Sequence, residues 1–210
     1  MTDQSVSERK RGAILMAARA VFSRKGYAET AVEDVAEEAR IAKGTLYLYF
    51  KSKEDLYLAA LANDLRRMSS RAREEMETVE GLREKLKAFL RVRLEYCRSH
   101  KEFLRIYLAE YGSIFVKAPL SRELCQLLKE NLRYVTEVVE EAIARGEIPP
   151  VPAGAVAAAV FDLSRGAIER RLLGWKEFQA GDEIEFITDV LWAGITRDSR
   201  RAPARRWKRA

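Results

Sequence analysis

Cysteine, histidine and proline are scarce in this chain of 210 residues, which holds two cysteines, one histidine and five prolines. Cys97 and Cys125 lie far apart in apolar helical patterns, so the sequence predicts buried free thiols in a reducing cytoplasm. Neither a disulfide framework nor a zinc site fits this spacing. His100 has no cysteine or carboxylate at ligand spacing, and we expect no metal and no other cofactor.

Long apolar runs and catalytic patterns are missing as well. No stretch of about 18 apolar residues exists that could span a membrane, and no secretory signal is predicted. The sequence shows neither paired cysteines nor a glycine-rich phosphate loop, so we do not expect an enzyme.

The net charge of +6 is concentrated at one end of the chain. Residues 200–210 contain six basic residues and no acid: Arg200, Arg201, Arg205, Arg206, Lys208 and Arg209. Without these six, 32 basic residues balance 32 acidic ones, so net charge alone does not indicate DNA binding. We expect this segment to be a flexible basic tail.

Signals for β-strands are equally scarce, because no segment alternates convincingly between apolar and polar residues. Apolar residues instead recur at three- and four-residue spacing, and few glycines and prolines interrupt them. The sequence predicts an all-α fold of about nine helices. The first four are expected over residues 7–25, 30–39, 43–49 and 53–78. Gly26 ends the first, a capping box of Thr30 and Glu33 begins the second, and Ser52 with Asp55 begins the fourth.

The two short helices in this series predict a helix-turn-helix. Ala36 is small enough for a close helix crossing, and Ile41 can fill the core beneath the turn. Leu46 and Phe50 share a face that anchors the third helix. The segment AKGTLYLYF (42–50) then offers hydroxyl, ammonium and backbone N–H donors to phosphate oxygens. Taken alone, such a tyrosine-rich stripe favours an ordinary core helix in a helical bundle.

The wider segment AVEDVAEEARIAKGTLYLYFKSKEDLYLAAL resembles the DNA-binding helix-turn-helix of the TetR family of bacterial transcriptional regulators. The resemblance covers residues 14–61, and KGTLYLYFKSKEDL is its most specific part. The rest of the chain resembles the family only in the number and length of its helices. The resemblance implies a three-helix DNA-binding domain over residues 1–52, an effector-binding and dimerisation domain over 53–199, and the tail.

The resemblance also implies which residues meet DNA. They are Thr30, Lys43, Gly44, Thr45, Tyr47, Tyr49 and Lys53. Thr45, Tyr47 and Lys53 are expected at backbone phosphates. Arg40 departs from the family pattern, which often has glycine in this turn, and a left-handed arginine there would cost about 1 kcal/mol. The acidic residues of the second helix, Glu33 among them, are expected to face away from DNA.

One recognition helix reads only a few base pairs, so we expect a homodimer on a pseudo-palindromic operator of double-stranded DNA. The last two helices, expected over 152–176 and 182–197, suit a four-helix bundle across a two-fold axis. The expected interface residues are Val160, Leu163, Ala167, Ile184, Ile187, Leu191, Gly194 and Ile195. The alternative is a helix buried in the core of a monomer.

The middle helices are expected to hold a mostly apolar pocket for a small-molecule effector. Its predicted lining residues are Phe103, Tyr107, Tyr111, Phe115, Leu128, Phe161 and Arg165. Arg93, Arg105 or Arg165 could pair with a ligand carboxylate. Each aromatic residue could equally fill a core, and each arginine could lie on the surface.

These features predict a cytoplasmic repressor that a small hydrophobic ligand releases from its operator. Fatty acyl thioesters and aromatic drugs are both candidate effectors by resemblance to the family. The alternatives are a DNA-binding dimer without a small-molecule effector and a regulator controlled by a protein partner.

Overall fold

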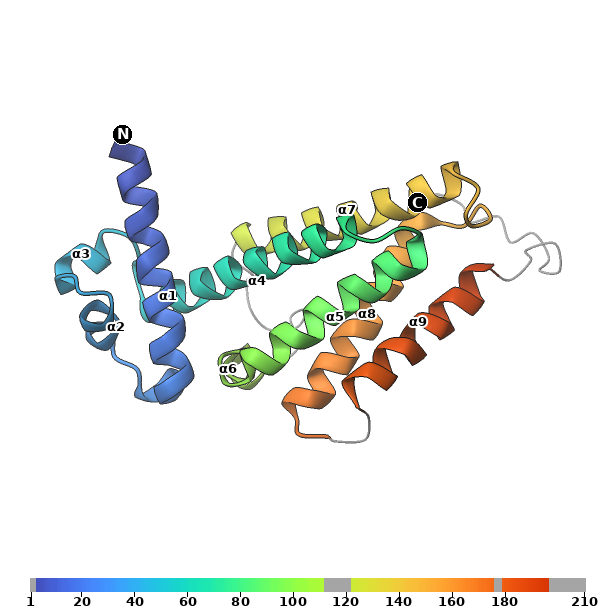
Figure 1. Cartoon of the computed structure of the whole chain (residues 1–210). Coiled ribbons are helices and arrows are strands. Elements are labelled where there is room, and N and C mark those ends of the chain that lie inside the picture. The colour runs from blue at the N-terminus through green and yellow to red at the C-terminus, as the bar shows by residue number, and fades with distance from the viewer. Residues whose placement is uncertain (1–2, 112–121, 176–178, 197–210) are drawn as a thin grey trace. The chain divides into compact units, whose positions relative to one another are not determined.

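The structure, a computed structural model, describes residues 3–111, 122–175 and 179–196, and the regular secondary structure within these ranges is helical (Figure 1). The helices are α1 (Asp3–Glu29), α2 (Val32–Glu38), α3 (Lys43–Tyr47), α4 (Lys53–Glu77), α5 (Leu82–Ser99), α6 (Lys101–Tyr111), α7 (Arg122–Ala144), α8 (Ala153–Leu172) and α9 (Ala180–Thr196). The all-α prediction is confirmed. Among these described helices, none is both long and apolar enough to cross a membrane.

The chain is divided into two compact units. The first consists of Met1–Arg71 and Glu95–Lys129, and the second of Ala72–Leu94 and Glu130–Ala210. Helices α4, α5 and α7 therefore each contribute residues to both units. The functional boundary expected after residue 52 falls within the first unit and stays a prediction.

A cluster of aromatic rings forms the centre of the first unit. Phe22 of α1 stands edge-on to Tyr57 of α4 with ring centroids 5.3 Å apart, and Tyr57 lies 5.1 Å from Phe103 of α6. All three side chains are fully buried, which contributes about 1.5–3 kcal/mol for each ring. The Tyr57 hydroxyl donates a 3.0 Å hydrogen bond to the Phe103 carbonyl. This cluster holds α1, α4 and α6 together.

The N-cap of α2 is Ala31, one position after the expected capping residue Thr30. Gly26 interrupts α1 with a φ of 79°, as expected, although a further turn continues to Glu29. The Asp34 carboxylate accepts a 2.9 Å hydrogen bond from the N–H of Ala31, so these two residues replace the expected pair of Thr30 and Glu33. Only this half of a capping box is present, because the N-cap residue Ala31 has no side-chain acceptor, while the Thr30 side chain is buried in the core.

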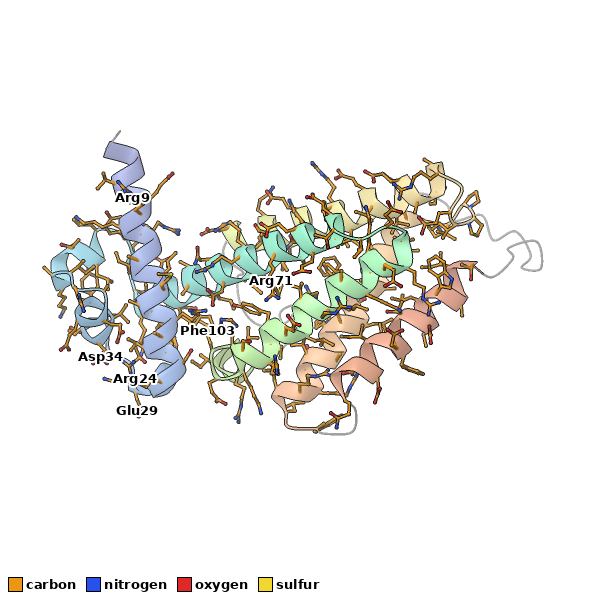
Figure 2. The ribbon with its side chains drawn as sticks, viewed as in Figure 1. Arg9, Arg24, Glu29, Asp34, Arg71 and Phe103 are labelled. Carbon is orange, nitrogen blue, oxygen red and sulfur yellow. The ribbon has the colours of Figure 1, made fainter. Side chains whose placement is uncertain are left out.

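Ion pairs fasten the end of α1 to α2. Arg24 pairs with Glu38 at 2.9 Å, and Lys25 pairs with Asp34 at 2.7 Å. Figure 2 shows Arg24 and Asp34 close together near the C-terminal end of α1. Helices α2 and α3 lie together on one side of α1 (Figure 1), so these pairs help to fix the whole helix-turn-helix.

Charged side chains also link the helices of the second unit. Lys87 of α5 pairs with Glu185 of α9 at 2.8 Å. Glu183 of α9 is 5% exposed and receives both Arg170, at 2.7 Å, and Arg171 of α8. Two cations offset the cost of burying one carboxylate, so α8 and α9 are held in register at this end.

Two helices end at least two residues earlier than predicted. Helix α3 stops at Tyr47 instead of residue 49, and α8 stops at Leu172 instead of residue 176. Gly174 explains the second difference, because its left-handed φ of 83° turns the chain away from the helix axis.

Candidate nucleic-acid interface and effector region

The turn between α2 and α3 is built on a left-handed arginine. Arg40 has a φ of 55° and is the one non-glycine residue with a positive φ in the described ranges. Its N–H donates to the Glu37 carbonyl, and the N–H of Ile41 donates to the Ala36 carbonyl, both at 2.9 Å. This pair of bonds is a Schellman motif, which glycine usually occupies. The left-handed conformation considered for Arg40 is therefore confirmed, and the motif sets the direction in which α3 leaves the turn.

Helix α3 buries one edge and exposes the other. Leu46 and Phe50 are 1% and 2% exposed, as their four-residue spacing predicts. Tyr47 and Leu48 are 45% and 83% exposed. The sequence reasoning missed Leu48, although it stands two positions after Leu46 and therefore about 200° round the helix. The exposed edge thus carries a phenol ring and an unpaired isobutyl group.

The other predicted contacts on α3 differ in exposure. Lys43 and Gly44 are exposed, whereas Thr45 and Tyr49 are half-buried. A Cβ added to Gly44 would meet no atom within 4 Å, so the fold itself does not require glycine there. The Tyr49 hydroxyl accepts a long hydrogen bond of 3.5 Å from Ser7 of α1. Tyr49 therefore leans toward α1 more than toward the exposed edge.

Lys43 forms an ion pair with Glu33 of α2. Both side chains are more than half exposed, at 57% and 53%, and the Lys43 ammonium lies 5.9 Å from the Tyr47 ring centroid. The hydrogen bond between them lowers the pKa of Glu33 and raises that of Lys43. The expectation that Glu33 faces away from the candidate interface is wrong, because the carboxylate lies beside the exposed edge of α3.

Thr30 and Lys53 serve the fold in this structure. Thr30 is 2% exposed and its hydroxyl donates to the Gly26 carbonyl at 2.6 Å, so it neither caps α2 nor reaches the surface. The Lys53 ammonium lies 4.8 Å from the Tyr27 ring centroid. It donates hydrogen bonds of 2.9, 3.2 and 3.1 Å to the carbonyls of Tyr27, Ala28 and Thr30. All three N–H bonds are used, so the predicted phosphate contact would require an exchange of partners.

The predicted effector residues of the first unit belong to its core. Phe103 is fully buried in the aromatic cluster, and Leu128 packs against the same core. The remaining candidates, Tyr107, Tyr111 and Phe115, have side chains outside the described part of the chain.

The predicted effector residues of the second unit lie on α8. Phe161 meets Phe89 of α5 with ring centroids 5.2 Å apart and an interplanar angle of 71°. Arg165 pairs with Asp162 of its own helix at 3.0 Å. Arg93 of α5, which the sequence offered as an alternative cation, is the arginine that lies against the Phe161 ring.

Most of the predicted interface residues of α8 and α9 face the core of their own chain. Six of the eight are at most 8% exposed: Val160, Ala167, Ile184, Ile187, Leu191 and Ile195. For these residues the alternative interpretation, a buried helix face, describes the structure. The sequence pattern could not separate the two apolar faces of α9, because both carry large aliphatic or aromatic residues.

A second apolar face of α8 and α9 remains exposed. Leu163, Phe186 and Val190 are 38%, 68% and 48% exposed, and Gly194 lies on the surface one turn beyond Val190. A groove of about 490 Å³ lies beside them between the two helices. Its lining residues are Asp162, Leu163, Gly166, Arg170, Asp182, Glu183, Phe186 and Ile187. Exposed apolar side chains gathered on one face are typical of a protein interface.

Comparison with known proteins supports the sequence resemblance. Residues 14–60 match the family model of the bacterial regulatory proteins of the tetR family. YhgD of Bacillus subtilis strain 168, an uncharacterized HTH-type transcriptional regulator, is 32% identical over 140 residues, which cover 65% of this chain and 71% of YhgD. The HTH-type transcriptional regulator RutR of Escherichia coli K12 is 31% identical over 153 residues, which cover 70% of this chain and 68% of RutR.

A solved structure shares the fold. The transcriptional regulator FadR of Bacillus subtilis, in complex with stearoyl-CoA, superposes with a TM-score of 0.71 at 21% identity and covers 87% of this chain and 98% of that one. The helix-turn-helix and the sequence relatives together define a DNA-binding transcriptional regulator. The chain belongs to the tetR family of bacterial regulatory proteins.

Proposed function

We propose that this regulator works as a homodimer whose two α3 helices enter major grooves of a pseudo-palindromic operator in the cytoplasm. In this proposal it represses transcription until a small hydrophobic ligand releases it. The division of α3 into a buried and an exposed edge carries the proposal. Leu46 and Phe50 hold the helix on its core, which leaves Tyr47, Leu48 and Lys43 available to DNA.

The exposed edge of α3 offers two kinds of contact. The Tyr47 hydroxyl and the Lys43 ammonium suit phosphate oxygens, and Gly44 allows the duplex to approach the backbone closely. Leu48 has no polar atom and suits the C5-methyl group of thymine in the major groove. We therefore assign affinity to Tyr47 and Lys43, and sequence preference at one position to Leu48.

The exposed face of α8 and α9 supports the homodimer. Phe186 and Val190 stand one turn apart on α9, with Gly194 a further turn along, where the absence of a side chain permits close helix approach. Leu163 of α8 joins the same kind of surface. A four-helix bundle across a two-fold axis would cover these groups with a second copy of themselves.

A structural neighbour indicates the chemistry of the proposed effector. FadR of Bacillus subtilis, which has the same fold, was solved with stearoyl-CoA, and this suggests an acyl ligand. A ligand of this kind would shift the population toward dimers whose α3 helices are spaced wrongly for the operator. Phe103 is buried in the core and Leu128 packs against it, which favours the alternative, a DNA-binding dimer without a small-molecule effector.

Selection of bound fragments from fragmented bacterial genomic DNA tests the proposal. The wild-type dimer should enrich a short inverted repeat. Tyr47→Ala should weaken binding to all fragments alike, whereas Leu48→Ala should relax the preference at a single position of each half-site. Enrichment of no common sequence by the wild type would refute the operator-binding function.

A further inference from the structure

The partly buried Arg93 of α5 lies against two aromatic rings of the second unit. Its guanidinium lies 5.3 Å from the ring centroid of Phe89, one turn earlier on α5, and 5.0 Å from that of Phe161 on α8. Its Nε donates a 3.0 Å hydrogen bond to the hydroxyl of Ser164, which is fully buried. The Ser164 hydroxyl donates in turn to the Phe161 carbonyl at 2.9 Å. Side chains from α5 and α8 therefore fix the guanidinium from two sides.

This cation has no acidic partner in the part of the chain that the structure describes. The buried carboxylate of the same unit, Glu183, is paired with two arginines, whereas Arg93 makes its one recorded hydrogen bond to a neutral hydroxyl. Burial lowers the pKa of Arg93 to about 10, and no nearby carboxylate opposes that effect. Only the Nε–H has an acceptor among the described residues, which leaves the two terminal nitrogen atoms of the fork.

The Arg93 side chain is partly buried, and a cation held in such a place without a counter-charge among the described residues is costly. The faces of the Phe89 and Phe161 rings offset part of this cost by cation–π attraction, but they accept no hydrogen bond from the fork. Two oxygen atoms of a carboxylate or a phosphate match the planar fork of an arginine. Within the described ranges no side chain supplies such a partner, so an anion from outside the protein would fit the fork.

We propose that Arg93 anchors the effector and that the effector is an organic anion with an apolar body. The apolar body follows from the surroundings: two phenyl rings flank the guanidinium, and Leu86 and Leu90 precede Arg93 on the same face of α5 and are fully buried. Inorganic phosphate alone would gain nothing from these groups. The inference deepens the effector part of the proposed function and is independent of the operator sequence.

Calorimetric titration of the full-length protein with three ligands that share one alkyl chain tests the site. Dodecanoate and dodecyl phosphate carry the two anionic head groups, and dodecanol is the neutral control. The wild type should bind at least one anion more tightly than the alcohol, and the preferred head group identifies the anion. Arg93→Met should lower the affinity for that anion by at least about 30-fold, because an ion pair with the bound ligand loses one partner. The affinity for the alcohol should stay unchanged.

Two further variants control for charge and packing. Arg91→Met removes the same charge from an exposed position of α5 and should bind all three ligands as the wild type does. Arg93→Lys keeps the charge without the fork and should retain part of the preference for the anion. The proposed role of Arg93 would be refuted if Arg93→Met lowered the affinities for the anion and the alcohol equally. It would also be refuted if the wild type bound neither anion.

Thermal unfolding without ligand separates this anchor from a structural pin. Methionine keeps an apolar stem between the rings of Phe89 and Phe161, so Arg93→Met should unfold at the same temperature as the wild type or higher. A large drop in unfolding temperature with unchanged anion affinity would identify a structural pin. Operator binding measured on the same samples tests the proposed function separately, because a failure there would leave the anion result standing.

Discussion

Replacing Glu33 with glutamine should change how DNA binding depends on salt. Glu33 neutralises Lys43 beside the exposed edge of α3, so Glu33→Gln removes one negative charge per protomer and frees one ammonium. Each additional phosphate that is neutralised steepens the slope of log affinity against log salt by about 0.9, which gives about 1.8 for a dimer. Between about 0.1 and about 0.3 M salt, this slope corresponds to an additional affinity loss of about sevenfold.

Fluorescence anisotropy with a duplex of unrelated sequence, measured over a salt series, gives this slope directly. The variant should bind more tightly than the wild type at low salt and lose that advantage as salt rises. Glu38→Gln is the matched control, because it breaks the exposed ion pair with Arg24 on the same helix, about 140° round the axis from Glu33. Equal slopes for Glu33→Gln and the wild type, or the same change in Glu38→Gln, would show that residue 33 does not face the duplex.

Three further predictions concern the dimer, the turn and the core. Phe186→Asp should convert the proposed dimer to monomers in sedimentation experiments without unfolding the protein. Leu132→Asp, at a 38% exposed apolar position of α7, should leave the proposed dimer intact, and a dimeric Phe186→Asp would exclude this face. Arg40→Gly should be more stable than Arg40→Ala by about 1 kcal/mol in urea unfolding, because only alanine keeps the strain at positive φ, and equal stabilities would contradict that strain. Burial raises the pKa of Asp64 above 3.8, more than Arg19 at 3.6 Å lowers it, so the folded state holds this proton more tightly than the unfolded state. The stability that this carboxyl contributes is present below pH 3.8 and is lost as the pH rises through the folded pKa. Asp64→Asn should therefore lose less stability than the wild type between about pH 4 and about pH 7. An identical pH profile of the two proteins would refute the raised pKa of Asp64.

Local patterns were sufficient to predict the helix-turn-helix. The four-residue spacing of Leu46 and Phe50 identified the buried edge of α3, and Gly26 marked the break in α1, because both depend only on neighbours along the chain. The same periodicity places Leu48 on the opposite, exposed side of the helix. These features follow from helix geometry alone.

Contacts between distant segments could not be predicted in this way. Lys53 binds carbonyls more than twenty positions earlier in the chain, and Glu33 meets Lys43 across a turn whose direction depends on Arg40. Helix α9 has two apolar faces, and only the packed structure shows that Ile187 belongs to the core while Phe186 does not. The sequence proposed Arg93 as one of three equivalent cations. Only the structure shows that it lies against the Phe161 ring of α8 and that it has no acidic partner among the described residues.

The ammonium of Lys53 joins the first residue of α4 to the end of α1 through three charge-assisted hydrogen bonds. The two helix ends can move little relative to each other, because a movement of α4 along its axis must either carry the end of α1 with it or break those hydrogen bonds. Arg24 and Lys25 then pass the displacement on to α2. The position of the helix-turn-helix is thus coupled to that of α4. A shift of α4 by a fraction of one turn would move α2 and α3 together as a rigid body and change the direction of α3.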